Sequence, residues 1–261
     1  MQNLVFNTAE ITALIGAYIW SFARISAMLM TAPVFSSKSV PIRVRVTLGI
    51  VCSLLIAPLL TELPVVDFLS AESFLIMINQ VIIGATIGFV LQFVFGVFVL
   101  AGQIFAMQTG LGFSMMNSPQ DGVQTTVVGQ MYVITTTLMF LAMHGHLFLI
   151  QMLLESFNKI PIGLNSINVQ GFWLLVSWGS DFYKHALMVV MPAIAAMLMV
   201  NVSFGVMAKA SPQLNPFSVG FMITIIFGFV IFYITLPSLL PYFIKLMEDG
   251  FGLAQKIIEM S

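Results

Sequence analysis

Apolar residues form six long segments along this chain, and charged residues fall mostly between those segments. The segments run over residues 11–33, 46–61, 73–108, 123–154, 172–208 and 217–244. About 20 apolar residues span a bilayer, and a backbone in lipid must satisfy its hydrogen bonds internally. The pattern therefore predicts an all-α, polytopic membrane protein built of long, kinked helical hairpins.

The third segment is longer than a bilayer requires. As one helix, residues 73–108 would extend about 54 Å at 1.5 Å per residue, whereas the hydrocarbon core is about 30 Å thick. Either the segment breaks, with Gly84, Gly88, Gly96 and Gly102 as candidate points, or it leaves the bilayer and is covered by protein. The second alternative predicts a subunit buried within an assembly. The Gly84–Gly88 spacing also permits close helix packing, within this chain or between chains.

The composition agrees with a membrane protein. Hydrophobic residues make up 59% of the 261 residues and charged residues only 7%, against about 25% charged residues in soluble domains. So few charges cannot cover a globule of this length with a hydrated surface. The net charge of −1 provides no basic field, so we expect membrane lipid as a partner and no nucleic acid.

The loops between segments differ in the sign of their charge. Residues 34–45 carry only basic charges: Lys38, Arg43 and Arg45. Residues 61–72 carry only acidic charges: Glu62, Asp67 and Glu72. Basic loops favour the cytoplasmic side, so we expect residues 34–45 to face the cytoplasm and residues 61–72 the opposite side.

Arg24 is the one fixed charge well inside an apolar segment. It could pair with an acid or with carbonyl groups of a partner, or its long side chain could extend toward the polar side near residues 34–45.

Sites for catalysis or metal binding are weakly represented. His144 and His146 are two residues apart, which on a helix points them in different directions and makes a poor metal pair. Asp181, Lys184 and His185 could form a local ion pair at a break in their segment. Because no nucleophile elbow, P-loop or zinc motif occurs, we expect no enzyme, no metal and no cofactor. A small-molecule secondary transporter is the alternative from another class, but no segment carries the mid-membrane carboxylate that such proteins commonly use.

The stretch Ala101–Gln130 is richer in small and soft residues than its surroundings. It contains five glycines, Phe113, the pair Met115–Met116 and a turn signal at residues 118–122. Thioether side chains adapt to irregular cavities. We therefore expect this stretch to form a loop that fills and closes a conduit, although methionine is also an ordinary filler of membrane cores.

Several short motifs occur in a fixed order: Thr31-Ala32-Pro33-Val34-Phe35; Pro41-x-Arg43-Val44-Arg45; Gln108-Thr109-Gly110-Leu111-Gly112-Phe113; Gly145-His146, leading to Glu155-Ser156-Phe157 and Pro161-Ile162-Gly163; and Ser211-Pro212-Gln213-Leu214-Asn215. Each motif alone is weak, but the ordered set resembles the FliR family of flagellar biosynthetic proteins over nearly the whole chain. The T component of the injectisome export apparatus is a homologous sister family and remains an alternative.

The resemblance implies a subunit of the core export gate of a type III secretion system. Such a gate would lie in the bacterial inner membrane within the flagellar basal body and pass unfolded flagellar proteins. Its partners would be FliP-type and FliQ-type subunits and an FlhB-type subunit. Residues 1–170 would form a FliP-like helical hairpin region, residues 171–245 a FliQ-like hairpin, and residues 246–261 an amphipathic C-terminal tail.

The resemblance also implies roles for individual residues. A plug loop over about residues 106–122 would close the pore with Met107, Gly110, Leu111, Gly112, Phe113, Ser114, Met115 and Met116. Anchoring and partner contacts would fall on Arg24, Lys38, Arg43, Arg45, Lys209, Gln213 and Asn215. Two positions depart from the family pattern: Asn117-Ser118-Pro119 replaces an acidic residue before proline, and Lys209 stands where an arginine is common.

Overall fold

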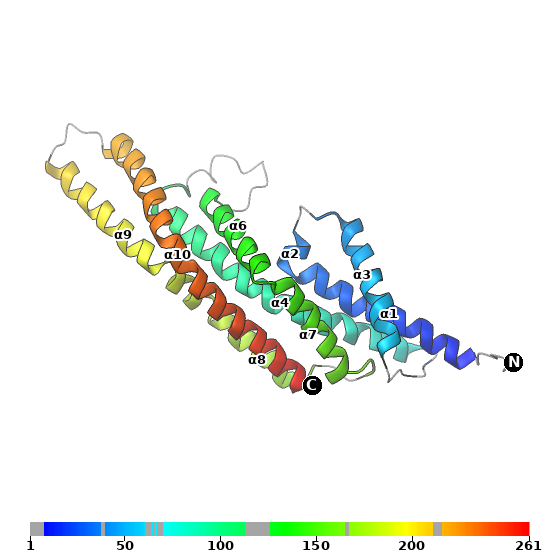
Figure 1. The fold of residues 1–261 in the computed structure, drawn as a ribbon. Coiled ribbons are helices and arrows are strands. Elements are labelled where there is room, and N and C mark those ends of the chain that lie inside the picture. The colour runs from blue at the N-terminus through cyan, green and yellow to red at the C-terminus, as the bar shows by residue number, and fades with distance from the viewer. Residues whose placement is uncertain are drawn as a thin grey trace. The chain divides into compact units, whose positions relative to one another are not determined.

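The computed structural model describes residues 8–37, 40–60, 64, 66, 70–112, 126–164, 167–210 and 216–260, and the regular elements in these ranges are all helical (Figure 1). Side chains are described from residue 15 onward and, in the last helix, from residue 220 onward. The elements are α1 (Thr8–Thr31), α2 (Pro33–Ser36), α3 (Ile42–Ile56), η1 (Ala57–Leu59), α4 (Ala71–Gln108), α6 (Val127–Ala142), α7 (Gly145–Lys159), α8 (Val169–Ser180), α9 (Phe182–Ala210) and α10 (Pro216–Glu259). The predicted all-α class is confirmed.

Four stretches of the described residues are long and apolar enough to cross a membrane: 42–59, 71–108, 169–210 and 220–259. A fifth arises if α6 and α7 count as one bent span. The polytopic prediction is therefore confirmed, although residues 11–33, counted in the sequence as a span, are not among them. These residues form α1, whose Trp20, Arg24 and Met28 side chains are buried inside the protein.

The breaks in the helices do not fall where glycine suggested. Helix α4 runs without interruption through all four glycines considered as break points. Residues 123–154 were expected to form one span, but α6 and α7 are separated at Met143 and His144, where His144 adopts the left-handed conformation with φ 56°. The break expected near Asp181 is present, since α8 ends at Ser180 and α9 begins at Phe182. Prolines lie inside α9 and α10, where each removes a backbone donor.

The glycines of α4 permit close contact with neighbouring helices instead. A Cβ added at Gly84 would overlap the carbonyl of Arg24 in α1, and a Cβ at Gly88 would lie 2.8 Å from the Met28 carbonyl. Small residues that let two backbones approach are a common device in membrane helix pairs. The Gly84–Gly88 pair therefore packs within this chain.

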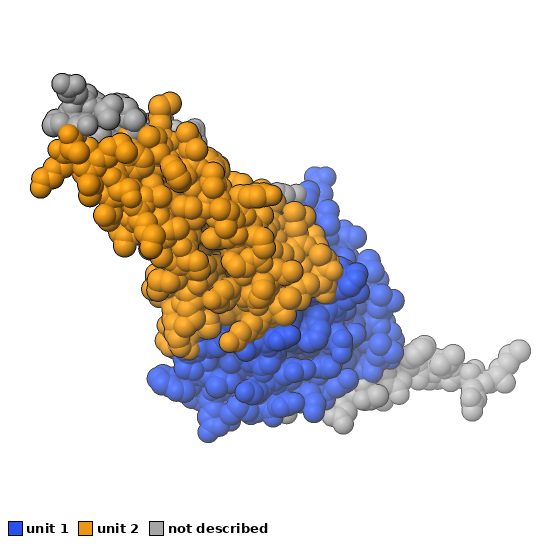
Figure 2. All heavy atoms as spheres, turned by 60° about the vertical axis from the view of Figure 1, so that its left-hand side comes forward, with its two compact units in different colours: residues 1–93, 144–179, 248–261 blue, residues 94–143, 180–247 orange. Residues whose placement is uncertain are grey.

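The chain divides into two compact units, coloured separately in Figure 2. Unit 1 comprises residues 1–93, 144–179 and 248–261, and unit 2 comprises residues 94–143 and 180–247. The boundary between the units crosses α4 after Phe93 and α10 after Met247, so each of these helices contributes to both units. The units are thus a different partition from the FliP-like and FliQ-like regions, which remain a prediction.

Unit 1 is organised around α1. Helix α3 contacts α1 at Gly49, where an added Cβ would lie 3.0 Å from Ser26 Oγ, and the first half of α4 contacts α1 through the glycine pair. The end of α10 packs against α8, since a Cβ at Gly171 would lie 3.3 Å from Ile257. Ile257 and Ile258 are buried, so the predicted amphipathic tail is the packed last part of α10.

Unit 2 has an aromatic core. Phe243 of α10 lies 5.6 Å from Phe98 and 6.3 Å from Phe95 between ring centroids, and Phe95 lies 5.6 Å from Phe140 of α6. Edge-to-face pairs at such distances contribute beyond their buried area. They join the second half of α4, α6 and the middle of α10.

Candidate functional site

The first end of the predicted plug is a capped helix terminus. Gly110 has φ 78°, the left-handed conformation with which glycine commonly ends a helix. The Gly110 amide donates to the Met107 carbonyl at 3.3 Å, and the Gly112 amide donates to the Ala106 carbonyl at 3.0 Å. Because these bonds occupy carbonyls that the helix leaves free, the chain leaves α4 in a fixed direction.

Helix α10 holds this terminus in place within unit 2. Thr109 is fully buried, and a Cβ added at Gly228 would lie 2.5 Å from Thr109 Cγ2. Phe221 lies beside Gly110, 2.9 Å from where a Cβ would be. Phe221 and Gly228, about two turns apart on α10, therefore contact consecutive residues at the end of α4.

An aromatic cluster supports the terminus one turn below. Phe232 of α10 stacks on Phe105 of α4 with centroids 6.5 Å apart and lies 5.4 Å from the Tyr132 ring of α6. All three side chains are buried. The cluster joins α4 and α6, which carry the two ends of the connection from Thr109 to Thr126, with α10.

The second end of the connection is also fixed. Thr126 is buried and caps α6, its Oγ1 accepting from the Gly129 amide at 3.0 Å, which satisfies one free donor of the helix terminus. A Cβ added at Gly102 would lie 2.7 Å from Gly129 Cα, so α4 and α6 are in backbone contact here. The two ends thus emerge from a closely packed helix pair.

Several expected plug residues can now be placed. Residues 106–108, expected at the start of the loop, belong to the last turn of α4, where Met107 is 73% exposed. Gly110, Leu111 and Gly112 form the turn. Phe113, Ser114, Met115 and Met116 lie outside the described residues, together with Asn117, so their expected positions stay a prediction.

Sequence reasoning missed the residues that hold the ends. Thr109 belongs to the Gln108–Phe113 motif, but its contact with Gly228 had no signal, because threonines and helical glycines are common in apolar segments. Thr126 could have been found, since a threonine directly before an apolar run is a helix N-terminus signal.

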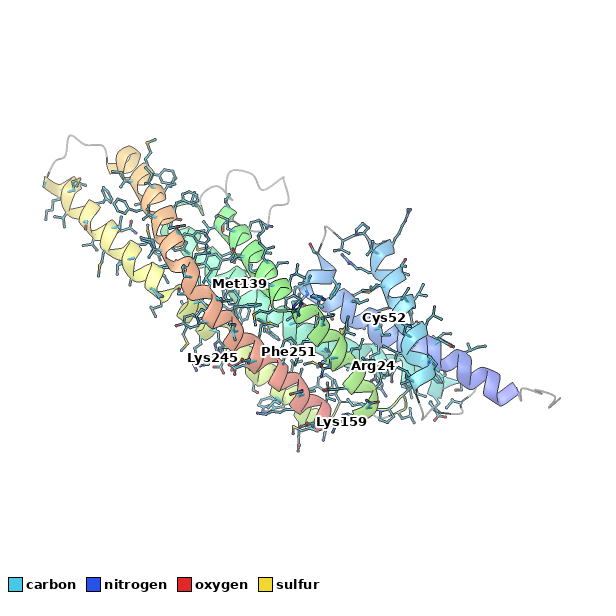
Figure 3. All side chains as sticks on the ribbon, viewed as in Figure 1. Arg24, Cys52, Met139, Lys159, Lys245 and Phe251 are labelled. Carbon is cyan, nitrogen blue, oxygen red and sulfur yellow. The ribbon has the colours of Figure 1, made fainter. Side chains whose placement is uncertain are left out.

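A second polar site lies in unit 1 around Arg24, which is fully buried (Figure 3). Its Nε donates to Gln80 Oε1 at 2.8 Å, and its Nη1 donates to the Ser156 carbonyl at 2.8 Å. Its Nη2 donates to the Ile160 carbonyl at 2.9 Å, and the guanidinium carbon lies 4.2 Å from the centre of the Phe157 ring. A planar guanidinium with five donors suits such a divergent set of acceptors.

This geometry corrects both expectations for Arg24. The guanidinium is held neither by a partner nor at the polar side of the membrane, because oxygen atoms of its own chain surround it. Its partners are an amide of α4 and two groups at the C-terminal end of α7, where free carbonyls carry partial negative charge. Arg24 therefore joins α1, α4 and α7.

The remaining predicted contact residues differ in their surroundings. Arg43 and Lys209 are exposed. Arg45 is half-buried, and its Nη2 donates to the carbonyls of Ser37 at 2.6 Å and Val40 at 3.0 Å, so it anchors the link before α3. Lys38, Gln213 and Asn215 lie outside the described residues.

The other polar groups considered in the sequence are two local clusters within the described residues. Asp181 pairs with Lys184 at 3.8 Å rather than with the His185 ring, and both side chains are about half exposed. The rings of His144 and His146 lie 6.2 Å apart. The described residues contain no group of three or more metal-ligating side chains.

Long apolar helices, a buried guanidinium bound by helix ends and glycine-mediated helix contacts define a polytopic membrane protein. Residues 15–250 match the family model described as bacterial export proteins, family 1. The flagellar biosynthetic protein FliR of Pectobacterium carotovorum subsp. carotovorum is 33% identical over 255 residues, covering 98% of this chain and 97% of that protein. FliR of Escherichia coli (strain K12) is 32% identical over 92% of both chains, and FliR of Aquifex aeolicus (strain VF5) is 26% identical over 92% of both.

The chain therefore belongs to the FliR family of bacterial export proteins, which confirms the resemblance found in its motifs. It is a membrane component of the flagellar protein export apparatus.

Proposed function

We propose that this chain is a pore-forming structural subunit of the flagellar type III export gate in the bacterial inner membrane, within the flagellar basal body. Residues 106–122 would close the channel through which unfolded flagellar proteins pass. FliP-type, FliQ-type and FlhB-type subunits would complete the gate around it. The flagellar names of its relatives favour this cargo over that of the injectisome.

One observation carries the proposal: both ends of the connection between α4 and α6 are held by buried contacts. Thr109 is buried and contacts Gly228 of α10, and Thr126 caps α6 where Gly129 contacts Gly102. The predicted plug lies between these two ends, and fixed ends would allow it to occupy one place in a channel. Free ends would let it drift and would leave the channel open.

The composition of the connection suits a reversible seal. Its sequence offers Phe113, Met115 and Met116 beside Gly110 and Gly112. Thioether and aromatic side chains exclude water and ions, and methionine repacks readily around irregular surfaces. Such a seal opens by displacement of side chains and needs no catalytic group.

The test is a deletion of Gly110–Met116 in the assembled gate. We expect the membrane to leak ions and small solutes, measured as conductance or as release of a small dye from vesicles that contain the complex. A second variant of equal length replaces the same residues with glycine and serine, which removes only the apolar side chains. It should leak as well if those side chains form the seal.

Co-purification of the partner subunits must be equal in all variants, so that a leak reports the channel and not a failed assembly. Conductance unchanged by the deletion in an intact complex would contradict the plug role and leave the family assignment untouched.

A further inference from the structure

Helix α3 with η1 differs from the other candidate spans in length. Residues 42–59 comprise 18 residues, whereas the other three stretches comprise 38, 42 and 40 residues. At about 1.5 Å per residue, α3 with η1 extends about 27 Å, whereas α4 extends about 57 Å, residues 220–259 of α10 about 60 Å, and α9 alone about 44 Å. Only α3 with η1, among the four candidate spans in the described chain, matches a hydrocarbon core of about 30 Å.

The surface of α3 is apolar on almost every side. A narrow stripe, Gly49, Ser53 and Ile56, is buried, and Gly49 meets Phe22 and Ser26 of α1. The remaining large apolar side chains are exposed: Ile42, Val44, Val46, Leu48, Ile50, Val51, Leu54, Leu55 and Leu59. Only 22% of this span is buried inside the protein, which is close to the 22% and 17% of the 169–210 and 220–259 stretches and far below the 61% of α4.

Such a surface fits lipid better than one partner helix. A helix that docks on another protein presents one apolar stripe and keeps a polar opposite face, whereas a helix apolar all round is typical of a membrane span. A single neighbouring helix would cover one side of α3 and leave the rest exposed. Acyl chains surround a helix from all free directions.

The charges at the two ends of α3 also support a position in the bilayer. Arg43 is exposed in the first turn, and Arg45 binds the preceding link. The sequence contains no acidic residue from 34 to 60, while Glu62 and Asp67 follow the far end. A basic end attracts the anionic headgroups of the cytoplasmic leaflet, at about 1 kcal/mol per charge, or about fivefold.

We propose that α3 and η1 form the span that anchors this subunit in lipid. Acyl chains occupy the exposed sides of α3, and anionic phosphate headgroups lie against Arg43. The rest of the long helices extends beyond the hydrocarbon core. This inference does not depend on the plug role, because it concerns only where the subunit meets the bilayer.

The chain offers a clean background for the test. Cys52, on α3 (Figure 3), is its single cysteine. In the Cys52→Ser background, Leu48→Cys and Leu55→Cys place a bimane fluorophore on exposed positions of α3. Lys159→Cys, at the exposed end of α7, serves as the matched control. The complete gate, with its other subunits made cysteine-free, is reconstituted in vesicles of phosphatidylcholine and phosphatidylglycerol.

Brominated lipid then reports contact with acyl chains. We expect brominated phosphatidylcholine to quench both α3 labels at least about twofold and to leave the Lys159 position unchanged. Unquenched labels on α3, together with photocrosslinks from a benzophenone at Leu55 to a neighbouring gate subunit, would overturn the proposal. The photocrosslinking experiment uses a chain that retains Cys52, so it also tests α3 without the Cys52→Ser substitution.

The headgroup part has its own measurement. Brominated phosphatidylglycerol should quench the Leu48 label about two- to fivefold more strongly than brominated phosphatidylcholine at equal content. Arg43→Gln should abolish that excess and preserve the quenching itself. An excess that persists in Arg43→Gln would exclude Arg43 as the headgroup contact.

Discussion

Replacing Arg24 with methionine should destabilise unit 1. Methionine retains much of the apolar stem and removes every donor. In the described chain, Arg24 is the partner of both Gln80 Oε1 and the Ile160 carbonyl, so both would be buried without a hydrogen bond. The Ser156 carbonyl would keep the Ile160 amide at 3.0 Å.

The structure sets the magnitude of this effect. A buried polar group that loses its partner costs about 1–3 kcal/mol, so two such groups give about 2–6 kcal/mol. Since 1 kcal/mol lowers the melting temperature of a domain of 150–250 residues by about 2–4 °C, we expect a loss of roughly 4–24 °C. Two measurements report this loss of stability: the temperature at which the membrane-embedded chain becomes sensitive to protease, and the steady-state amount of the chain.

Two variants make this test specific. Arg43→Met removes an exposed arginine. It should change the stability measured by the protease transition by less than about 0.5 kcal/mol, as is usual for surface substitutions. Arg24→Met combined with Gln80→Leu removes donor and acceptor together and should recover part of the loss, because replacing both partners by apolar groups is often nearly neutral. An Arg24→Met chain as abundant and heat-resistant as the parent would refute the reasoning.

Three further predictions concern packing. Gly84→Ala should lower the stability measured by the protease transition by about 1–3 kcal/mol, because the added methyl group overpacks against α1. Gly205→Ala, where no described atom lies within 4 Å, should be neutral or stabilising by up to about 1 kcal/mol. Equal effects of the two substitutions would contradict close packing at Gly84. Gly228→Val should displace the turn that ends α4 and raise membrane conductance, with Gly252→Val as the control in the same helix, and an unchanged conductance in intact complexes would argue against that contact. Ile257→Asp should expose the end of α10 to protease, because it buries a charge; unaltered digestion would mean that this end is not packed.

Periodicity and length predicted the helical class and most helices of this protein, because apolar segments in lipid have few alternatives. They did not predict where helices break. The glycines of residues 73–108 were candidates both for breaks and for close helix packing, and the structure shows that they allow α1 and α6 to approach α4. The sequence cannot distinguish these uses, since both require a missing side chain and only the neighbour decides.

The candidate sites were predictable to different degrees. The left-handed Gly110 follows from its position after a long helix, and the resemblance pointed to the same turn. The contact of Thr109 with α10 spans more than one hundred residues, for which the sequence holds no local signal. Arg24 was recognised as exceptional, but its acceptors at the end of α7 are backbone carbonyls, which every sequence position possesses.

The expectation that overlong apolar helices need cover from other proteins must therefore be divided among the helices. Much of the cover of α4 comes from its own chain, since 61% of its most apolar part is buried. The corresponding parts of the α8–α9 stretch and of α10 are only 22% and 17% buried, although each stretch exceeds the thickness of a bilayer. Lipid cannot cover their full length, so we expect neighbouring subunits to cover α9 and α10 in particular. Expressed alone, the chain should aggregate through the exposed surfaces of α9 and α10. Partner subunits that cover α9 and α10 should prevent this aggregation, whereas covering α3 alone should not.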